Sequence, residues 1–269
     1  MSDPRVLLDI DGPIASVRLN RPDKLNGVDL ALLHELIAVS RTIRADRSVR
    51  AVLLSGEGRS FSAGLDFGSV MSDRTRMWRG FVPNPLSGQN LFQHACWTWR
   101  ELPVPVVAVV RGHCYGAGLQ LALAADFRFT TPDAKWSVLE AKWGLVPDMS
   151  GTASLRELVG GDVARRLAMT GEVIDGTTAH GYGLATGVAD DPAVPARDLV
   201  DAILTRSPDS VAATKSLLNR TRHARVRTAF AIERRLQLAM FRAKNTAAAQ
   251  KAGAKGETPA FGPRQFGRG

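Results

Sequence analysis

Cysteine is scarce in this sequence, and its spacing supports no metal site. The 269 residues include only two cysteines, Cys96 and Cys114. They form no Cys-x-x-Cys pair, and no Cys/His cluster with ligand-like spacing accompanies them. We therefore expect no metal, and we expect both thiols to be reduced, as is usual for cytosolic proteins.

The sequence also lacks a long hydrophobic run. The longest apolar run, Val104 to Val110, contains a proline and is far shorter than the ~20 residues of a membrane-spanning helix. The first residues, Met1 to Arg5, do not have the pattern of a signal peptide. We expect a cytoplasmic protein that has no membrane partner.

The composition is that of an ordinary soluble enzyme, except for its excess of positive charge. Hydrophobic residues make up 45% and charged residues 23%, and the length suffices for one large domain with a small helical extension. The net charge is +9 and the pI is about 10.2. Such a surface either attracts polyanions, including nucleic acid and phosphorylated cofactors, or serves only as a solubilising charge.

Alternating strand and helix patterns predict an α/β fold with parallel crossovers. Strand-like segments 6–10 and 14–19 flank the turn sequence Asp-Gly-Pro and predict a hairpin. Asp29 is a candidate N-cap for a helix over residues 30–45, and residues 49–55 are typical of a strand.

Beyond residue 66 the alternation of strand and helix patterns first weakens and then resumes. We expect irregular structure over 68–91, a helix over 90–102, a strand over 104–110, a helix over 119–125 and a strand over 127–131. 

The C-terminal part is strongly basic. We divide the chain into a core of residues 1–195, a helical region of residues 196–252 and an extended or disordered tail of residues 253–269.

Two glycine-centred turns suggest chemistry at an acyl group. Ala63-Gly64-Leu65-Asp66 and Tyr115-Gly116-Ala117-Gly118 each follow an apolar run and precede a helix-like stretch, and Glu140 lies beyond the second helix. Two backbone N–H groups aimed at one oxygen form an oxyanion hole, and a carboxylate beside them can move a proton. Either turn alone is better explained by an ordinary strand-to-helix connection.

In their order, these motifs resemble the crotonase superfamily, that is, the enoyl-CoA hydratase/isomerase family. The matching segments are residues 20–26, 61–66, 112–122, 140 and 144–148, and the resemblance covers roughly residues 5–220. It implies a spiral of ββα units whose helical C-terminal region assembles a homotrimer or a dimer of trimers. It also implies an acyl-CoA substrate, so coenzyme A enters with the substrate and no separate cofactor is expected.

The resemblance also implies roles for single residues. Leu65 and Ala117 would supply the two oxyanion N–H groups. Coenzyme A would lie against four further residues, Lys24, Leu25, Ala63 and Asp66.

The family's hydratases use two glutamates, and this chain keeps one of them. Glu140 matches the second position, whereas Gln120 occupies the first. An amide orients water but does not titrate, so it cannot act as a general acid or base. One carboxylate suffices to shuttle a proton between two carbons, which favours a double-bond isomerase with Glu140 as acid/base. The alternative is a hydratase in which Glu140 works alone and Gln120 orients the water.

Two further alternatives stay open. Asp148 lies eight residues after Glu140, where the family's dienoyl-CoA isomerases also carry an aspartate; it is either catalytic or caps a loop. A non-catalytic member that binds coenzyme A, or binds RNA through its basic helices, is the third functional interpretation. Because no RNA-binding motif is present, we do not expect a nucleic-acid partner.

Overall fold

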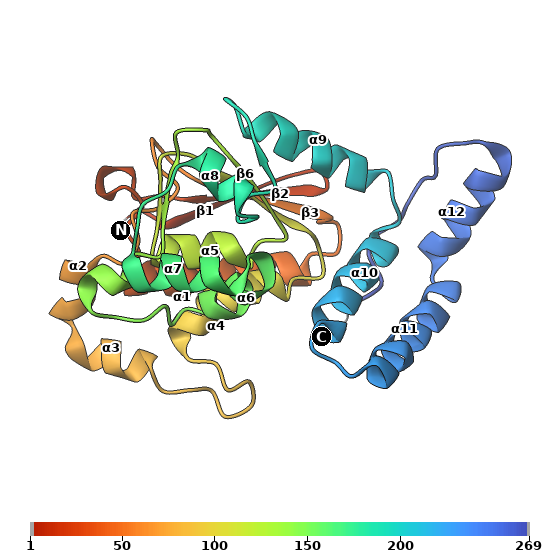
Figure 1. The fold of residues 1–269 in the computed structure, drawn as a ribbon. Helices are drawn as coiled ribbons and strands as arrows, with labels where there is room; N and C mark the ends of the chain where they lie inside the picture. The colour runs from red at the N-terminus through yellow and green to blue at the C-terminus, as the bar shows by residue number, and fades with distance from the viewer. Residues whose placement is uncertain (1–2, 268–269) are drawn as a thin grey trace.

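The computed structural model describes residues 3–267 and is built around one six-stranded sheet (Figure 1). The strand order is β1-β2-β3-β4-β6-β8, with β1 antiparallel to β2 and every other neighbouring pair parallel. These strands are β1 (Val6–Asp11), β2 (Ile14–Leu19), β3 (Ala51–Gly56), β4 (Val106–Val110), β6 (Phe127–Thr130) and β8 (Gly187–Val188). A second, two-stranded parallel sheet pairs β5 (His113–Tyr115) with β7 (Lys135–Ser137). The prediction of an α/β fold with parallel crossovers is confirmed.

The two faces of the main sheet are covered by different helices. Helices α1 (Leu30–Ala45), α4 (Leu91–Arg100) and α5 (Ala117–Ala124) enclose the larger core, in which Leu36 and Trp99 are almost completely buried. Helix α9 (Ala193–Leu204) covers the opposite face, where Ala196 and Val200 pack against sheet residues (Figure 1). Burial of apolar side chains on both faces explains the near-continuous hydrophobic sequence of β4.

The remaining helices either connect strands of the sheet or follow its last strand. They are η1 (Pro22–Lys24), α2 (Phe67–Ser72), α3 (Arg74–Gly80), η2 (Leu139–Trp143), α6 (Gly151–Leu158), α7 (Gly161–Thr170), α8 (Gly176–Gly181), α10 (Pro208–Thr221), α11 (Val226–Phe241) and α12 (Lys244–Lys255). Helices α10, α11 and α12 stand to one side of the sheet (Figure 1). 

Local sequence signals place the first elements correctly. The hairpin β1–β2 pairs Val6 with Leu19 and Asp11 with Ile14. The Asp29 side chain accepts a hydrogen bond from the Leu32 N–H at 2.8 Å, so α1 begins where the N-cap predicts.

The expectation of irregular structure throughout residues 68–91 is wrong. Helices α2 and α3 occupy most of its first half, each with an aspartate at its N-cap. Asp66 accepts from the Ser69 N–H at 3.1 Å, and Asp73 accepts from the Arg76 N–H at 3.0 Å. Both caps were visible in the sequence, but the short helices beyond them show little periodicity.

Other predicted boundaries shift by one to three residues. The helix expected at residue 119 begins at Ala117, because Gly116 has a positive φ of 47° and serves as its N-cap. The C-terminal helices begin at Ala193 rather than residue 196 and end at Lys255 rather than residue 252.

The C-terminal tail is attached to α10 by a buried carboxylate. Asp209 is 0% exposed, and its Oδ1 accepts from the backbone N–H groups of Gln265 and Phe266 at 2.5 and 2.7 Å. Its Oδ2 accepts from Asn245 Nδ2 at 2.8 Å. Residues 257–267 contain no helix or strand, yet they are held against α10 and α12.

We predict that Asp209→Ala will release this tail. Hydrogen bonds to a charged group contribute about 1.5–3 kcal/mol each, and three are lost. Limited proteolysis should then cut within residues 256–267 faster than in the unchanged protein. Asp201→Ala is the control, because Asp201 is an exposed α9 carboxylate whose partner is the neighbouring Arg197. Equal protection of the tail in both variants would contradict the prediction.

Candidate active site

Among the described residues, the first glycine turn leaves the Leu65 N–H without a protein acceptor. The Val28 N–H donates to Gly64 O at 2.8 Å, and the Asp66 N–H donates to Val28 O at 2.9 Å. These bonds form a short parallel bridge between Val28 and Leu65, in which the Leu65 N–H takes no part. Within residues 3–267, this N–H donates to no other protein group.

The second turn supplies another backbone N–H group that has no protein acceptor in the part of the chain that the structure describes. Ala117 is the first residue of α5, where a backbone N–H has no partner within its own helix. The two turns touch, because a Cβ on Gly64 would lie 2.9 Å from the Tyr115 carbonyl oxygen. Gly64 also has a φ of 93°, so both its conformation and its surroundings exclude a side chain.

A cavity of about 110 Å³ lies between the two turns. Five residues singled out from the sequence line it: Ala63, Leu65, Ala117, Glu140 and Asp148. The other lining residues are Gly64, Phe67, Gly116, Leu139, Trp143, Leu145 and Met149. The cavity therefore joins two backbone donors and two carboxyl groups within an otherwise largely apolar wall.

Glu140 lies in η2 with one of its oxygens held and the other free. Its Oε1 accepts a hydrogen bond from Gln120 Nε2 at 2.7 Å, and a Cβ on Gly116 would lie 3.3 Å from this oxygen. Its Oε2 is buried and, in the described part of the chain, has no hydrogen-bond partner. Burial raises the pKa of this carboxyl and the charge of Asp148 adds to the effect, whereas the Gln120 hydrogen bond opposes it.

Gln120 holds Glu140 from behind the cavity. Its side-chain oxygen accepts from the Met149 N–H at 2.8 Å and from the Gly151 N–H at 2.9 Å, while its amide nitrogen donates to Glu140. The residue is 2% exposed. A Cβ on Gly151 would lie 2.5 Å from Gln120 Cγ, so glycine is required at this contact. Both lone pairs of the amide oxygen are thus occupied by the backbone.

Asp148 lies next to Met149 in the loop between η2 and α6, and it lines the same cavity. It is half-buried, and burial raises the pKa of its carboxyl. Since Gln120 binds the adjacent Met149 N–H, one amide fixes both the Glu140 carboxyl and the backbone beside Asp148.

The four residues assigned to coenzyme A lie together beside the first turn. The Ala63 N–H donates to Leu25 O at 2.8 Å, and a Cβ on Gly27 would contact both Lys24 O and Asp66 Cβ. Lys24 is exposed. Of these four residues, Ala63 also lines the cavity, so the set lies at its edge.

An aromatic pair forms part of the cavity wall. The rings of Phe67 and Trp143 lie 5.0 Å apart and join the segment after Asp66 to η2. Trp143 was one of five tryptophans in the chain, and nothing in its local pattern distinguished it from the buried Trp99 and Trp136.

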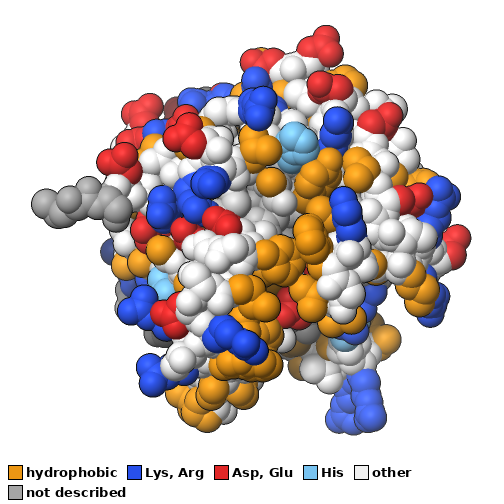
Figure 2. Space-filling model, turned by 90° about the vertical axis from the view of Figure 1, so that its left-hand side faces the viewer, with side chains coloured by type: hydrophobic (Ala, Val, Ile, Leu, Met, Phe, Trp, Pro, Cys, Tyr) orange, Lys and Arg blue, Asp and Glu red, His pale blue; other side chains and the backbone are white. Residues whose placement is uncertain are grey.

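Hydrophobic side chains continue from this wall onto the surface. Figure 2 views the molecule from the side where α2 and α3 lie and shows hydrophobic side chains gathered across the middle and lower part of that face. The exposed large hydrophobic residues of α2, α3, η2 and the loops that follow α3 and η2 are Met71, Trp78, Phe81, Val82, Leu86, Trp143, Leu145 and Val146.

Comparison with known families shows which family the chain belongs to. The family model described as "Enoyl-CoA hydratase/isomerase" matches residues 9–258. The chain belongs to the enoyl-CoA hydratase/isomerase family. The crotonase-type fold and the membership expected from the motifs are therefore confirmed.

Relatives within the enoyl-CoA hydratase/isomerase family carry different activities. The chain is 31% identical over 231 residues to the short-chain-enoyl-CoA hydratase of Clostridium acetobutylicum, covering 85% of this chain and 86% of that one. It is 31% identical over 215 residues to the mitochondrial Delta(3,5)-Delta(2,4)-dienoyl-CoA isomerase of Dictyostelium discoideum, covering 77% and 73%. The enoyl-CoA hydratase structure from Bacillus anthracis superposes with a TM-score of 0.87 at 25% identity, covering 96% and 98%. Family membership therefore establishes an enzyme without choosing its reaction.

Within residues 3–267, no group of three or more His, Cys, Asp or Glu side chains is placed to hold a metal ion. None of the helices described there combines the length and hydrophobicity that a bilayer crossing requires.

We predict that Glu140→Gln will stabilise the folded chain at neutral pH. The amide keeps the acceptor for Gln120, but it removes a carboxyl whose ionised form is destabilised by burial. The pKa of Glu140 is raised in the folded chain, so its carboxyl destabilises the folded state at pH values above that pKa. The difference in stability between the two proteins disappears below about pH 4, where the carboxyl is protonated in both the folded and the unfolded chain. The Tm of both proteins, measured across this pH range, tests the prediction. Glu233→Gln, at an exposed α11 position, is the control; a pH-independent difference at Glu140 would refute the explanation.

Proposed function

We propose that this enzyme acts on an unsaturated acyl-CoA thioester and moves its double bond through an enolate. The observation that carries the proposal is the position of Glu140: its buried Oε2 has no hydrogen-bond partner among residues 3–267, and Glu140 lines the same cavity as Leu65 and Ala117. Relatives named as hydratases and isomerases of CoA thioesters support the substrate class.

The proposed reaction needs one base and one oxyanion hole. The thioester oxygen accepts hydrogen bonds from the Leu65 and Ala117 N–H groups. Glu140 Oε2 removes a proton from the carbon next to the carbonyl of a 3-enoyl-CoA, and the electron pair delocalises into a dienolate. The same carboxyl returns the proton two carbons further along, which gives the 2-enoyl-CoA. The raised pKa of Glu140 suits a group that both accepts and donates a proton.

The engagement of Gln120 favours isomerisation over hydration. Hydration requires a water molecule to be positioned and deprotonated, and Gln120 has no free acceptor because both lone pairs of its oxygen receive backbone N–H groups. We infer that Gln120 positions Glu140 rather than water. One observation supports the alternative, a hydratase in which Glu140 works alone. The second N–H of the Gln120 amide has no protein partner in the described region, so it could donate a hydrogen bond to a water molecule.

Asp148 gives the same cavity a second carboxyl group. Its charge raises the pKa of Glu140, so the two groups interact. We propose that Asp148 is a second acid that serves longer conjugated substrates, in which the proton moves further along the chain. Substrates with a single double bond depend on Glu140.

The remaining expectations stay predictions. They include the homotrimer or dimer of trimers, the cytoplasmic location, the contacts of Lys24, Leu25, Ala63 and Asp66 with coenzyme A, and the absence of any other cofactor.

We expect the purified enzyme to convert 3-enoyl-CoA to 2-enoyl-CoA, followed by absorbance of the conjugated thioester. Glu140→Ala should lower kcat by about 10²- to 10⁴-fold, the typical contribution of general acid–base catalysis. Asp148→Asn should spare this reaction while lowering turnover of a dienoyl-CoA. Isomerase or hydratase turnover that survives Glu140→Ala would rule out the mechanism.

We predict that Gln120→Glu will affect isomerisation and hydration in opposite directions. In the proposed isomerase, a second carboxylate 2.7 Å from Glu140 Oε1 raises the pKa of the pair and slows isomerisation at neutral pH. In the alternative hydratase, the added base increases addition of water to 2-enoyl-CoA. Gln237→Glu, at an exposed α11 position, controls for the added charge. A large gain in hydration would favour the alternative.

A further inference from the structure

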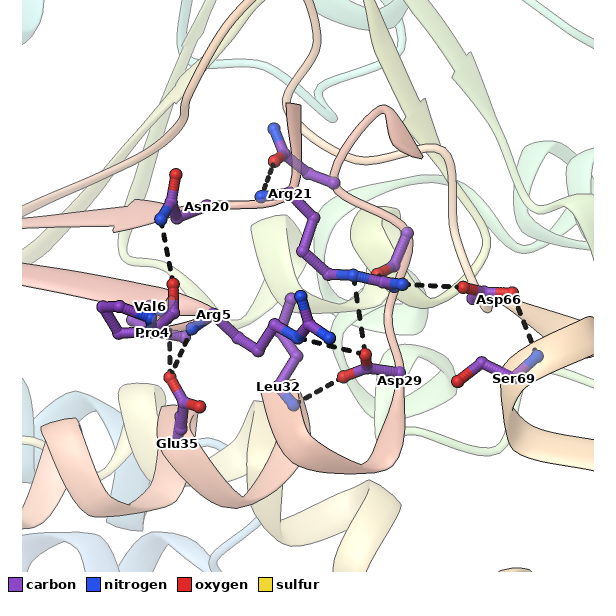
Figure 3. A network of polar contacts seen from close by, with 12 residues as sticks. Pro4, Arg5, Val6, Asn20, Arg21, Asp29, Leu32, Glu35, Asp66 and Ser69 are labelled. Carbon is purple, nitrogen blue, oxygen red and sulfur yellow. Dashed lines mark hydrogen bonds and ion pairs between the residues drawn. The ribbon is translucent and has the colours of Figure 1, made fainter. Parts of the chain in front are cut away.

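Arg21 occupies a nearly buried position where three segments of the chain meet (Figure 3). Its side chain is 9% exposed, and its Nη2 lies 2.9 Å from Asp66 Oδ2. Its Nε lies 3.5 Å from Asp29 Oδ2, and its Nη1 donates to Gly27 O. One guanidinium thus contacts the loop after β2, the start of α1 and the residue that follows Leu65.

Both carboxylates held by Arg21 also cap helices. Asp29 caps α1 through the Leu32 N–H, and Asp66 caps α2 through the Ser69 N–H (Figure 3). Burial alone would raise the pKa of Asp66, but the Ser69 N–H and Arg21 hold it below its usual value, so this carboxyl is ionised at neutral pH. Arg21 therefore fixes the N-terminal ends of two helices relative to each other.

Asp66 is covalently adjacent to the proposed oxyanion donor. The orientation of the Leu65 N–H depends on the peptide between Gly64 and Leu65. The Gly64 side of that peptide has little room to move, because Gly64 lies close to the Tyr115 carbonyl. On the other side, the Asp66 N–H binds Val28 O and the Asp66 carboxylate binds Arg21. The ion pair with Arg21 ties this side to the body of the protein, and the charge of Lys24 also acts on the Asp66 carboxylate.

We propose that Arg21 is a positioning residue that aims the Leu65 N–H at the thioester oxygen. The inference rests on the proposed function, because it assumes that Leu65 forms half of an oxyanion hole. Oxyanion donors act mainly on the transition state, so a small misalignment lowers kcat more than it alters KM.

Two variants weaken this contact in different ways. Arg21→Lys keeps the charge but cannot reach Asp66, Asp29 and Gly27 O together, because lysine lacks the planar fork of arginine. Asp66→Asn keeps an oxygen to cap α2 but loses the ionic contact with Arg21. Arg18→Gln is the matched control, since Arg18 also pairs with two carboxylates, Asp9 and Glu57, but is more exposed and does not contact the glycine turn.

Kinetics supply the first test. We expect Arg21→Lys and Asp66→Asn each to lower kcat for 3-enoyl-CoA between about 10- and 100-fold with little change in KM. The double variant should lose little more than either single one, because both remove the same contact. Loss of a coenzyme A contact would instead appear in KM. If Arg21→Lys does not fold, as judged by its Tm, Asp66→Asn decides the result.

Vibrational spectroscopy supplies the second test and separates the two proposals. The probe is 2-butenoyl-CoA with an isotope-labelled carbonyl, bound to Glu140→Gln so that turnover does not consume it. An oxyanion hole lowers the carbonyl stretching frequency, and adding Arg21→Lys should reduce that shift while adding Arg18→Gln should not. Absence of any shift in Glu140→Gln alone would refute the oxyanion hole itself. A full shift in the presence of Arg21→Lys, or an unchanged kcat in both Arg21→Lys and Asp66→Asn, would overturn the role of Arg21.

Discussion

The three hydrogen bonds of the Gln120 amide are the interaction on which the geometry of the cavity depends. Through them the first turns of α5 hold Glu140 in η2 and the backbone on both sides of Ser150. The amide is neutral, so it places a carboxyl without competing with it for protons. The other carboxyl oxygen of Glu140 is buried and has no hydrogen-bond partner within residues 3–267. In the mechanism that we propose, the departure from the two-glutamate pattern changes the role of this position from proton transfer to support of Glu140.

The fold supplies the rest of the site through backbone geometry. The small sheet of β5 and β7 brings the Gly116 turn beside η2, because the Gly116 N–H donates to Ser137 O at 3.0 Å. Glycine at residue 64 lets the first turn approach within contact of Tyr115. Leu65, Ala117 and Glu140 thus line one cavity. In the proposed oxyanion hole, both donors are backbone N–H groups, so no flexible side chain has to be ordered to supply them. This arrangement destabilises the folded state at neutral pH, because burial and the charge of Asp148 disfavour the ionised form of Glu140.

Several features could be predicted from sequence because they are local. The hairpin, the helix capped by Asp29 and the strand–turn–helix around Gly116 each follow from residues within a few positions of one another. The glycine turns and Glu140 also placed the chain in its family. Short helices without strong periodicity, such as α2 and α3, were missed although their aspartate caps were present.

The sequence by itself determined which groups are available: two glycine turns, one glutamate where hydratases have two, and an aspartate eight residues further on. Tertiary structure alone decided what they contact. Gln120 meets residues 20 to 31 positions away, and Arg21 meets Asp66 at a separation of 45 residues. The physical reason is that caps and turns are satisfied by neighbours in the chain, whereas the partner of a buried polar side chain is fixed by how the sheet and helices pack.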